Sequence, residues 1–123
     1  MATPPCSQSS TWGANEVQLP NRKMTPADLE KFVAHEYFFT ASQGVRAAGY
    51  LPLDDLPGSL CCMTFCVIVM TNGYILTGQS ACADPADFNA DLGQKLARQD
   101  AIKQMWPLVG FVRRDQLHEA EKG

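Results

Sequence analysis

The stretch that decides the fold is Cys61–Cys82, CCMTFCVIVMTNGYILTGQSAC. Two apolar runs flank Asn72-Gly73, the strongest short-range signal of a β-hairpin, because a type I′ turn needs positive φ at both central residues. The sequence therefore predicts a hairpin with a two-residue loop, and this loop length fixes the strand register. The predicted facing pairs are Thr71 with Tyr74, Val69 with Leu76, Val67 with Gly78, and Phe65 with Ser80.

The first strand of this hairpin is apolar on both of its faces. One predicted face carries Met63, Phe65, Val67, Val69, Tyr74 and Leu76. The other predicted face carries Cys62, Thr64, Cys66, Ile68, Met70, Ile75, Thr77 and Gln79. A strand that is apolar on both sides needs cover on both, from helices or from another subunit. We therefore expect a homo-oligomer, either a dimer or a larger assembly.

A first helix is predicted to begin at Thr25, because Thr25-Pro26-Ala27-Asp28 is close to a capping box with Pro at the first helical position. Its apolar stripe is formed by Leu29, Phe32, Val33 and Tyr37, and it is expected to stop near Phe39. Residues 40–44 have the composition of a turn, and residues 52–58 that of a loop. Between them, residues 45–50 fit either a short helical turn or an edge strand.

A second helix is predicted from Asp84, with Pro85 at its first position, to a stop at Pro107. Small residues recur four apart along this helix, at Gly93, Ala97 and Ala101, which would let it approach a sheet closely. Residues 109–117 are predicted to form a final strand.

These elements predict one small α+β domain, α–ββ–α–β, with an antiparallel, hairpin-based sheet packed by two helices. The domain is expected to span residues 24–117. Residues 1–23 are expected to be a mobile arm and residues 118–123 a flexible tail.

The composition is that of an ordinary globular protein, 46% hydrophobic and 19% charged. A net charge of −3 argues against a non-specific nucleic-acid binder, which would carry a basic face. The five cysteines include an adjacent pair, and no secretory signal is visible, so a reducing, cytoplasmic location is expected. The longest apolar run, Met63–Met70, is too short to cross a membrane.

Neither metal nor catalytic chemistry is predicted. Cys62 and Cys66 would lie about 13 Å apart on one strand face, too far for one zinc ion to bridge, and no CxxC occurs. The chain also lacks GxxxxGK, GxGxxG and GxSxG motifs. We expect no cofactor and no enzyme activity.

The most unusual segment is His35–Ser42, HEYFFTAS, which mixes aromatic rings with hydroxyls and leads through Gly44 to Arg46. Rings can stack on a base and a guanidinium can hold phosphate, so the segment fits a pocket for a nucleotide-like ligand. The same residues also fit a purely structural role, in which the rings belong to the core and the arginines are solvated. The candidate ligand-binding residues are Tyr37, Phe38, Thr40, Ser42, Arg46, Phe88, Arg98, Arg113 and Arg114.

A series of motifs running from about Thr25 to Leu117 resembles the gene-49/gene-66 family of small tailed-phage proteins, of the phage N4 and Sf6 type. The matching segments are His35–Ala41, Leu60–Cys66, Asn72-Gly73, Thr77–Cys82, Asp84–Asn89, Gly93, Ala97-Arg98 and Met105–Leu108. The resemblance implies a bacteriophage or prophage origin and action in the host bacterial cytoplasm. The family name alone implies no activity.

In size, layout and an aromatic and arginine-bearing segment, the chain is also similar to phage anti-defence sponges, including those that act against Thoeris immunity. Such proteins bind cyclic ADP-ribose-type or cyclic oligonucleotide signals without cleaving them, and they assemble as dimers or larger rings. This similarity implies a non-catalytic binder that sequesters a small nucleotide immune signal. The alternative is a protein–protein interaction module that acts on a host protein through the exposed hairpin face.

Overall fold

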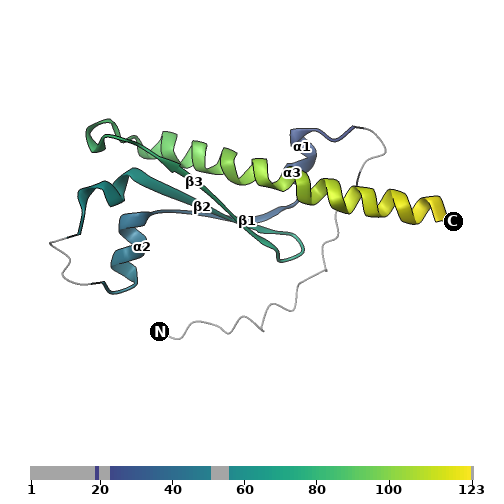
Figure 1. Cartoon of the computed structure of the whole chain (residues 1–123), viewed down its shortest axis with the longest axis horizontal. Coiled ribbons are helices and arrows are strands. Elements are labelled where there is room, and N and C mark those ends of the chain that lie inside the picture. The colour runs from purple at the N-terminus through teal and green to yellow at the C-terminus, as the bar shows by residue number, and fades with distance from the viewer. Residues whose placement is uncertain (1–18, 20–22, 51–55, 123) are drawn as a thin grey trace.

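The computed structural model describes residues 19, 23–50 and 56–122 (Figure 1). The elements in chain order are α1 (Pro26–Glu30), β1 (Val33–Thr40), α2 (Ala41–Ala47), the 3-10 helix η3 (Gly58–Cys62), β2 (Met63–Met70), β3 (Ile75–Ala81), the 3-10 turn η4 (Pro85–Asp87) and α3 (Ala90–Lys122). The α+β class is therefore as predicted, whereas the order of helices and strands differs from the prediction.

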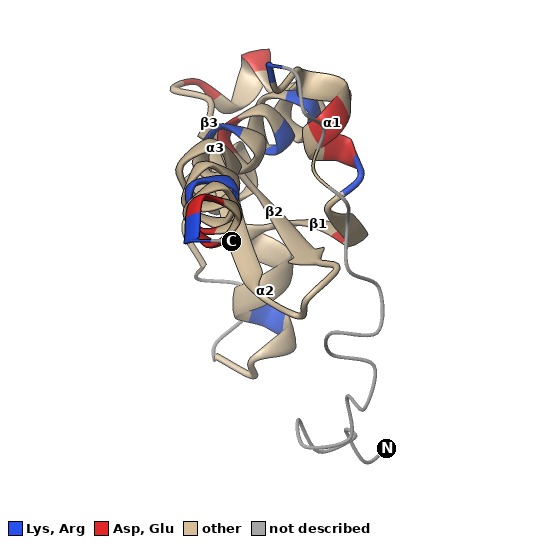
Figure 2. Cartoon of the chain, turned by 90° about the vertical axis from the view of Figure 1, so that its right-hand side faces the viewer, with Lys and Arg blue, Asp and Glu red and all other residues tan. Residues whose placement is uncertain are grey.

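The sheet has three strands in the order β1-β2-β3, and both pairings are antiparallel. The long helix α3 lies along one face of this sheet and continues past its end, while the short α2 lies at the opposite face near the other end (Figures 1 and 2). The fold is thus a sheet with one well-covered side.

The hairpin forms where the sequence predicts it, but its loop and register are different. Gly73 has a φ of 89°, and no residue other than glycine has a positive φ in the described part of the chain, so Asn72 does not form a type I′ turn. Gly73 N donates to Met70 O at 2.8 Å and Met70 N donates to Tyr74 O at 2.8 Å. This is the three-residue loop in which a type I turn is followed by a left-handed glycine.

One extra loop residue shifts every predicted pair by one position. Val69 pairs with Ile75 rather than Leu76, Val67 with Thr77 rather than Gly78, and Phe65 with Gln79 rather than Ser80. Tyr74 closes the loop onto Met70 instead of facing Thr71. Because side chains alternate along a strand, the shift moves Leu76 to the buried face and Ile75 to the other.

The buried face of the sheet and α3 together form the core. The buried hydrophobic side chains of this core are Cys66, Ile68, Met70 and Leu76 from the strands and Ala97, Ala101, Met105 and Val109 from α3, joined by Leu29 and Phe32. The α3 members recur every four residues, so a single stripe of the helix contacts the sheet.

The predicted first helix is correct at its start and wrong after one turn. Thr25 N donates to Asp28 Oδ2 at 2.8 Å, as the capping-box motif predicts, and α1 ends at Glu30. The chain then forms β1, whose residues Tyr37 and Phe39 pair with Val67 and Phe65 of β2. The spacing of apolar residues fitted a helix, but pairing with a distant strand decides the conformation here.

Residues 40–44, predicted as a turn, form the beginning of α2. Thr40 N donates to Gln43 Oε1 at 2.9 Å and Gln43 N donates to Thr40 Oγ1 at 3.2 Å. This reciprocal pair is a capping box, and it starts a helix that includes residues 45–47.

The C-terminal part of the chain contains one long helix and no strand. Asp84 caps only the short η4, and α3 begins at Ala90. The helix passes through Pro107 because its buried stripe continues on both sides of it, with Met105 0% and Val109 2% exposed. The predicted strand at 109–117 and most of the predicted tail therefore belong to α3.

The predicted close approach between helix and sheet is confirmed. A Cβ atom built on Gly78 would lie 2.1 Å from Ala97 O and 2.8 Å from Ala101 Cβ. Glycine in β3 and alanines in α3 are therefore matched at the point where the helix backbone meets the strand.

The outer edge of β3 is occupied by side chains of α3. Gln79 N donates to Asp100 Oδ2 at 3.0 Å, and Gln104 Nε2 donates to Thr77 O at 2.7 Å. These bonds satisfy backbone groups that an edge strand otherwise offers to another chain.

Of the expected N-terminal arm, residues 1–18 and 20–22 lie outside the described residues, as do residues 51–55 of the expected loop. Leu19 packs against the core from this segment.

Candidate functional site

A small hollow lies where the end of β1, the start of β2, α2 and the start of α3 meet. Its volume is about 170 Å³. It is lined by Phe38, Phe39, Thr40, Gln43, Thr64, Phe88, Ala90 and Gln94, and we refer to it as the aromatic–amide hollow. Most of its exposed lining is polar, yet none of these residues carries a charge.

Thr64 gives this hollow an unusual property. This residue is 2% exposed, and its buried hydroxyl has no hydrogen-bond partner within residues 19, 23–50 and 56–122. The hydroxyl is held against α3, because a Cβ on Gly93 would lie only 2.8 Å from Thr64 Oγ1. A buried hydroxyl without a partner costs about 1–3 kcal/mol, so a group that bonds to it would recover that free energy.

The capping box of α2 orients another part of the lining. Gln43 Oε1 accepts from Thr40 N, which leaves the amide NH2 of Gln43 as a donor. Gln94 is exposed at the first turns of α3 and adds a second amide. Amides and hydroxyls beside aromatic rings can bond to the edge of a flat, neutral, nitrogen-containing ring while its face stacks.

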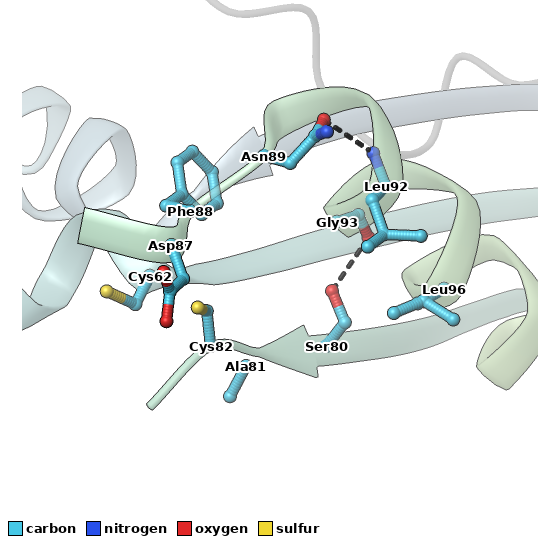
Figure 3. Close-up of a pocket in the computed structure, with 10 residues that line it drawn as sticks. All are labelled: Cys62, Ser80, Ala81, Cys82, Asp87, Phe88, Asn89, Leu92, Gly93 and Leu96. Carbon is cyan, nitrogen blue, oxygen red and sulfur yellow. Dashed lines mark hydrogen bonds between the residues drawn. The ribbon is translucent and has the colours of Figure 1, made fainter. Parts of the chain in front are cut away.

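A second hollow lies on the other side of the same helix start and shares Phe88 with the first (Figure 3). Its lining is mostly apolar apart from the Asp87 carboxylate, and three of its polar side chains bond to nearby protein atoms. Ser80 Oγ donates to Gly93 O at 2.7 Å, Cys82 Sγ to Asp84 O at 3.1 Å, and Leu92 N to Asn89 Oδ1 at 3.1 Å. These contacts cap and fasten the start of α3, and they explain the hollow as part of the fold.

The thiols of Cys62 and Cys66 are protonated at neutral pH, because the pKa of each is raised. Burial, with neighbouring Cys61 as the next cause, raises the pKa of Cys62. Burial raises the pKa of Cys66 to about 11. A thiol is a nucleophile only as the thiolate, so these two groups are not activated for covalent chemistry.

Arg98, a candidate ligand-binding residue, is engaged in a structural ion pair. Its Nε donates to Glu36 Oε2 at 2.7 Å and its Nη1 donates to Glu30 Oε1 at 2.8 Å. These hydrogen bonds raise the pKa of Arg98, and the bond from Arg98 lowers the pKa of Glu30. The guanidinium thus ties β1 and α1 to α3.

The structure divides the other candidate residues among four places. Phe38, Thr40 and Phe88 come together in the aromatic–amide hollow. Ser42 and Arg46 lie on α2, where Arg46 Nε donates to Ser42 Oγ at 3.3 Å. Arg46 follows Gln43 by three residues, which places the two on the same side of the helix.

The remaining candidates lie elsewhere. Tyr37 points to the sheet face opposite α3 and stacks on His35 with 6.3 Å between ring centroids. Arg113 and Arg114 lie on the part of α3 beyond the buried stripe, and Arg114 Nη2 donates to Glu121 Oε1 at 2.9 Å.

Five lining residues were not predicted: Phe39, Gln43, Thr64, Ala90 and Gln94. Thr64 had a signal in the sequence, because it is the single polar residue of β2. Gln43 had the signal of a capping box with Thr40. Gln94 had none, because its place depends on where α3 begins.

Within residues 19, 23–50 and 56–122, no three His, Cys, Asp or Glu side chains group as metal ligands would. None of the helices that the structure describes combines the length and the apolar character that a membrane crossing requires.

The family model described as "Phage protein (N4 Gp49/phage Sf6 gene 66) family" matches residues 24–117. No curated protein and no solved structure matches the chain.

Proposed function

The chain belongs to this phage protein family, and from that premise we propose that it is a phage accessory protein that binds a small nucleotide immune signal without cleaving it. The signal class is a cyclic ADP-ribose-type molecule or a cyclic oligonucleotide. Binding would remove the signal from the host defence that responds to it, in the host cytoplasm.

The observation that carries this proposal is a hollow lined by aromatic rings and amides, together with Thr64, whose buried hydroxyl has no hydrogen-bond partner among the described residues. Apolar hollows are common, but most of the exposed lining of this one is polar, and a ligand group that reached the Thr64 hydroxyl would supply its missing hydrogen bond. A nucleobase has the flat face and the polar edge that this lining fits.

The size of the hollow limits what it can hold. Its volume of about 170 Å³ is below the roughly 300–1,000 Å³ of pockets that enclose drug-sized ligands. It therefore takes one ring of a nucleotide, and the phosphates remain outside it. Arg46 is on the same side of α2 as Gln43, and we expect its guanidinium to contact those phosphates.

The absence of a charged group in the lining supports binding rather than cleavage. Phosphodiester or glycosidic cleavage uses a general acid, a base or a metal ion near the scissile bond. The hydroxyl and amide groups of the hollow can form hydrogen bonds, but they do not ionise near neutral pH and so cannot act as a general acid or base.

The test is thermal unfolding of the full chain against cyclic ADP-ribose isomers, cyclic di- and trinucleotides, and inorganic phosphate. A ligand present at about 100 times its Kd stabilises the folded protein by about 2.7 kcal/mol, so the midpoint temperature of unfolding should rise measurably. Mass spectrometry of the recovered ligand should return the intact molecule. No stabilisation by any cyclic nucleotide, or a cleaved product, would refute the proposal.

Thr64→Val separates ligand binding from stability. It removes the hydroxyl and keeps the shape, so the free protein should be as stable as wild type or more stable by about 1 kcal/mol. Affinity for the ligand should fall about tenfold, as expected for one lost hydrogen bond. Thr77→Val, the same change at an exposed position outside the hollow, should leave affinity unchanged.

A further inference from the structure

Among the residues that the structure describes, none covers most of the sheet face opposite α3. Strand pairing places the odd-numbered residues of β2, β3 and β1 from His35 onward on this side. They are His35, Tyr37, Phe39, Met63, Phe65, Val67, Val69, Ile75, Thr77, Gln79 and Ala81, which we call the odd face. None of these side chains is buried, and Tyr37 and Ile75 are 57% and 59% exposed.

The opposite face of the sheet shows how deeply α3 buries the strand side chains that it covers. There the even-numbered side chains of β2 are at most 5% exposed under α3 and its neighbours. The odd side of β2 carries Met63, Phe65, Val67 and Val69, which are as apolar as the buried set. An antiparallel sheet with one wet face normally alternates apolar and polar residues, and this central strand does not.

The odd face has the anatomy of an interface. Its centre is the apolar line along β2, with Tyr37 and Ile75 beside it. The polar side chains His35, Thr77 and Gln79 lie on the two outer strands, at the margin. An apolar centre with a polar rim is typical of surfaces that bind another protein.

Charge distinguishes between kinds of occupant. The odd face contains no Lys, Arg, Asp or Glu, whereas most charged residues of the described part of the chain lie on the helices (Figure 2). A nucleic acid or an anionic lipid surface would find no cation there. A two-fold axis places each surface against itself, so a neutral face can meet its copy without the repulsion that a chain of net charge −3 would otherwise bring.

From these observations we infer that a second copy of this chain covers the odd face, so that two three-stranded sheets pack face to face with an α3 on each outer side. Sheets packed in this way lie about 10 Å apart and interdigitate their inner side chains. Extension of the sheet beyond β3 is blocked by Asp100 and Gln104 of α3. The odd face and the aromatic–amide hollow share Phe39, whereas Tyr37 and Ile75 lie outside the hollow, so changes at these two positions test the dimer apart from the proposed ligand.

The area of the odd face sets the expected affinity between the two copies. Three strands about 4.8 Å apart and about 25 Å long offer a contact that buries on the order of 1,000 Å² in total, the lower end for a stable interface. The dimer should therefore be reversible and depend on protein concentration.

The test is sedimentation velocity of the full chain over about a hundredfold range of concentration. Wild type should shift from monomer to dimer. Tyr37→Lys and Ile75→Lys each place two charges in the apolar centre of the dimer, so each should raise the dissociation constant at least about a hundredfold. Both positions are more than half exposed in the single chain, so the variants should fold, which circular dichroism checks.

Phe111→Lys is the matched control, because Phe111 is a 74% exposed apolar residue on α3 outside the odd face. Its dissociation constant should equal that of wild type. The inference is wrong if wild type stays monomeric throughout, if both odd-face variants still dimerise like wild type, or if Phe111→Lys dissociates the dimer as they do. A monomer that instead binds one host protein through this face would also overturn it.

Discussion

At the scale of single residues, contacts between backbone atoms matter more in this fold than the size of the side chains. Gly78 and Ala97 are small because β3 and α3 touch through main-chain atoms. Thr64 is the opposite case, a polar side chain that is kept in the core without a partner. Both features depend on tertiary contacts, and a sequence pattern shows only that small or polar residues occur there.

Gly78→Ala should destabilise the protein severely. The new methyl would lie 2.1 Å from Ala97 O, and a helix backbone cannot move aside as a side chain can. Urea unfolding should show a loss of about 3 kcal/mol. Gly110→Ala, where nothing lies within 4 Å of the added atom, should instead gain up to about 1 kcal/mol from helix propensity. Equal stability of Gly78→Ala and wild type would contradict the close approach.

The Arg98 ion pairs should make stability depend on pH. Because Arg98 lowers the pKa of Glu30, the stabilisation is present above the ordinary carboxyl pKa and is lost as the pH falls through the lowered value. Arg98→Gln should cost about 1 kcal/mol at pH 7, since the groups are partly exposed, and the difference from wild type should narrow toward pH 3.

Urea titrations at both pH values measure this difference. Arg114→Gln is the control, because the Arg114–Glu121 pair is 61% exposed on both sides and should contribute little. A pH-independent loss in Arg98→Gln would mean that the side chain acts through packing alone.

At the scale of elements, the sequence predicted those whose signals are local. The start of α1, the position of the hairpin turn and the small-residue stripe of α3 each follow from a few neighbouring residues. The loop type could not be predicted in this way, because Asn72-Gly73 also suits a loop in which only the glycine has a left-handed conformation. The strand β1 was missed because its residues continue a helical spacing and become a strand only by pairing with β2.

The path of α3 through Pro107 is the clearest case of packing overriding a local signal. Proline removes the hydrogen bond to Lys103 O and strains the turn before it, yet Met105 and Val109 are both buried. Pro107→Ala should therefore raise the free energy of unfolding by about 1–3 kcal/mol. Pro26→Ala is the comparison, because Pro26 at the first turn of α1 costs no bond and its loss should bring no gain. Thermal unfolding of both variants measures this difference. A loss of stability in Pro107→Ala would contradict the prediction and would mean that the fold depends on proline at this position.

At the scale of the whole molecule, the sequence predicted the class and part of the candidate site. Phe38, Thr40 and Phe88 lie together as a pocket requires, while the arginines do not join them. The separation arises because α3 is one continuous helix: it carries Arg113 and Arg114 away from the sheet, and it uses Arg98 to hold β1 and α1. An error in one helix boundary thus moved several predicted site residues at once.

The position of α3 in the chain has a consequence for synthesis. The strands leave the ribosome first, and the helix that covers Cys66 and Ile68 and closes the edge of β3 leaves last. Until then the nascent sheet has two bare faces and an open edge, which is the state most exposed to misassembly. Synthesis of α3 covers one face of the sheet and the edge of β3 at the same time. A chain stalled on the ribosome after residue 89 should therefore need a chaperone, whereas a chain that includes α3 should not.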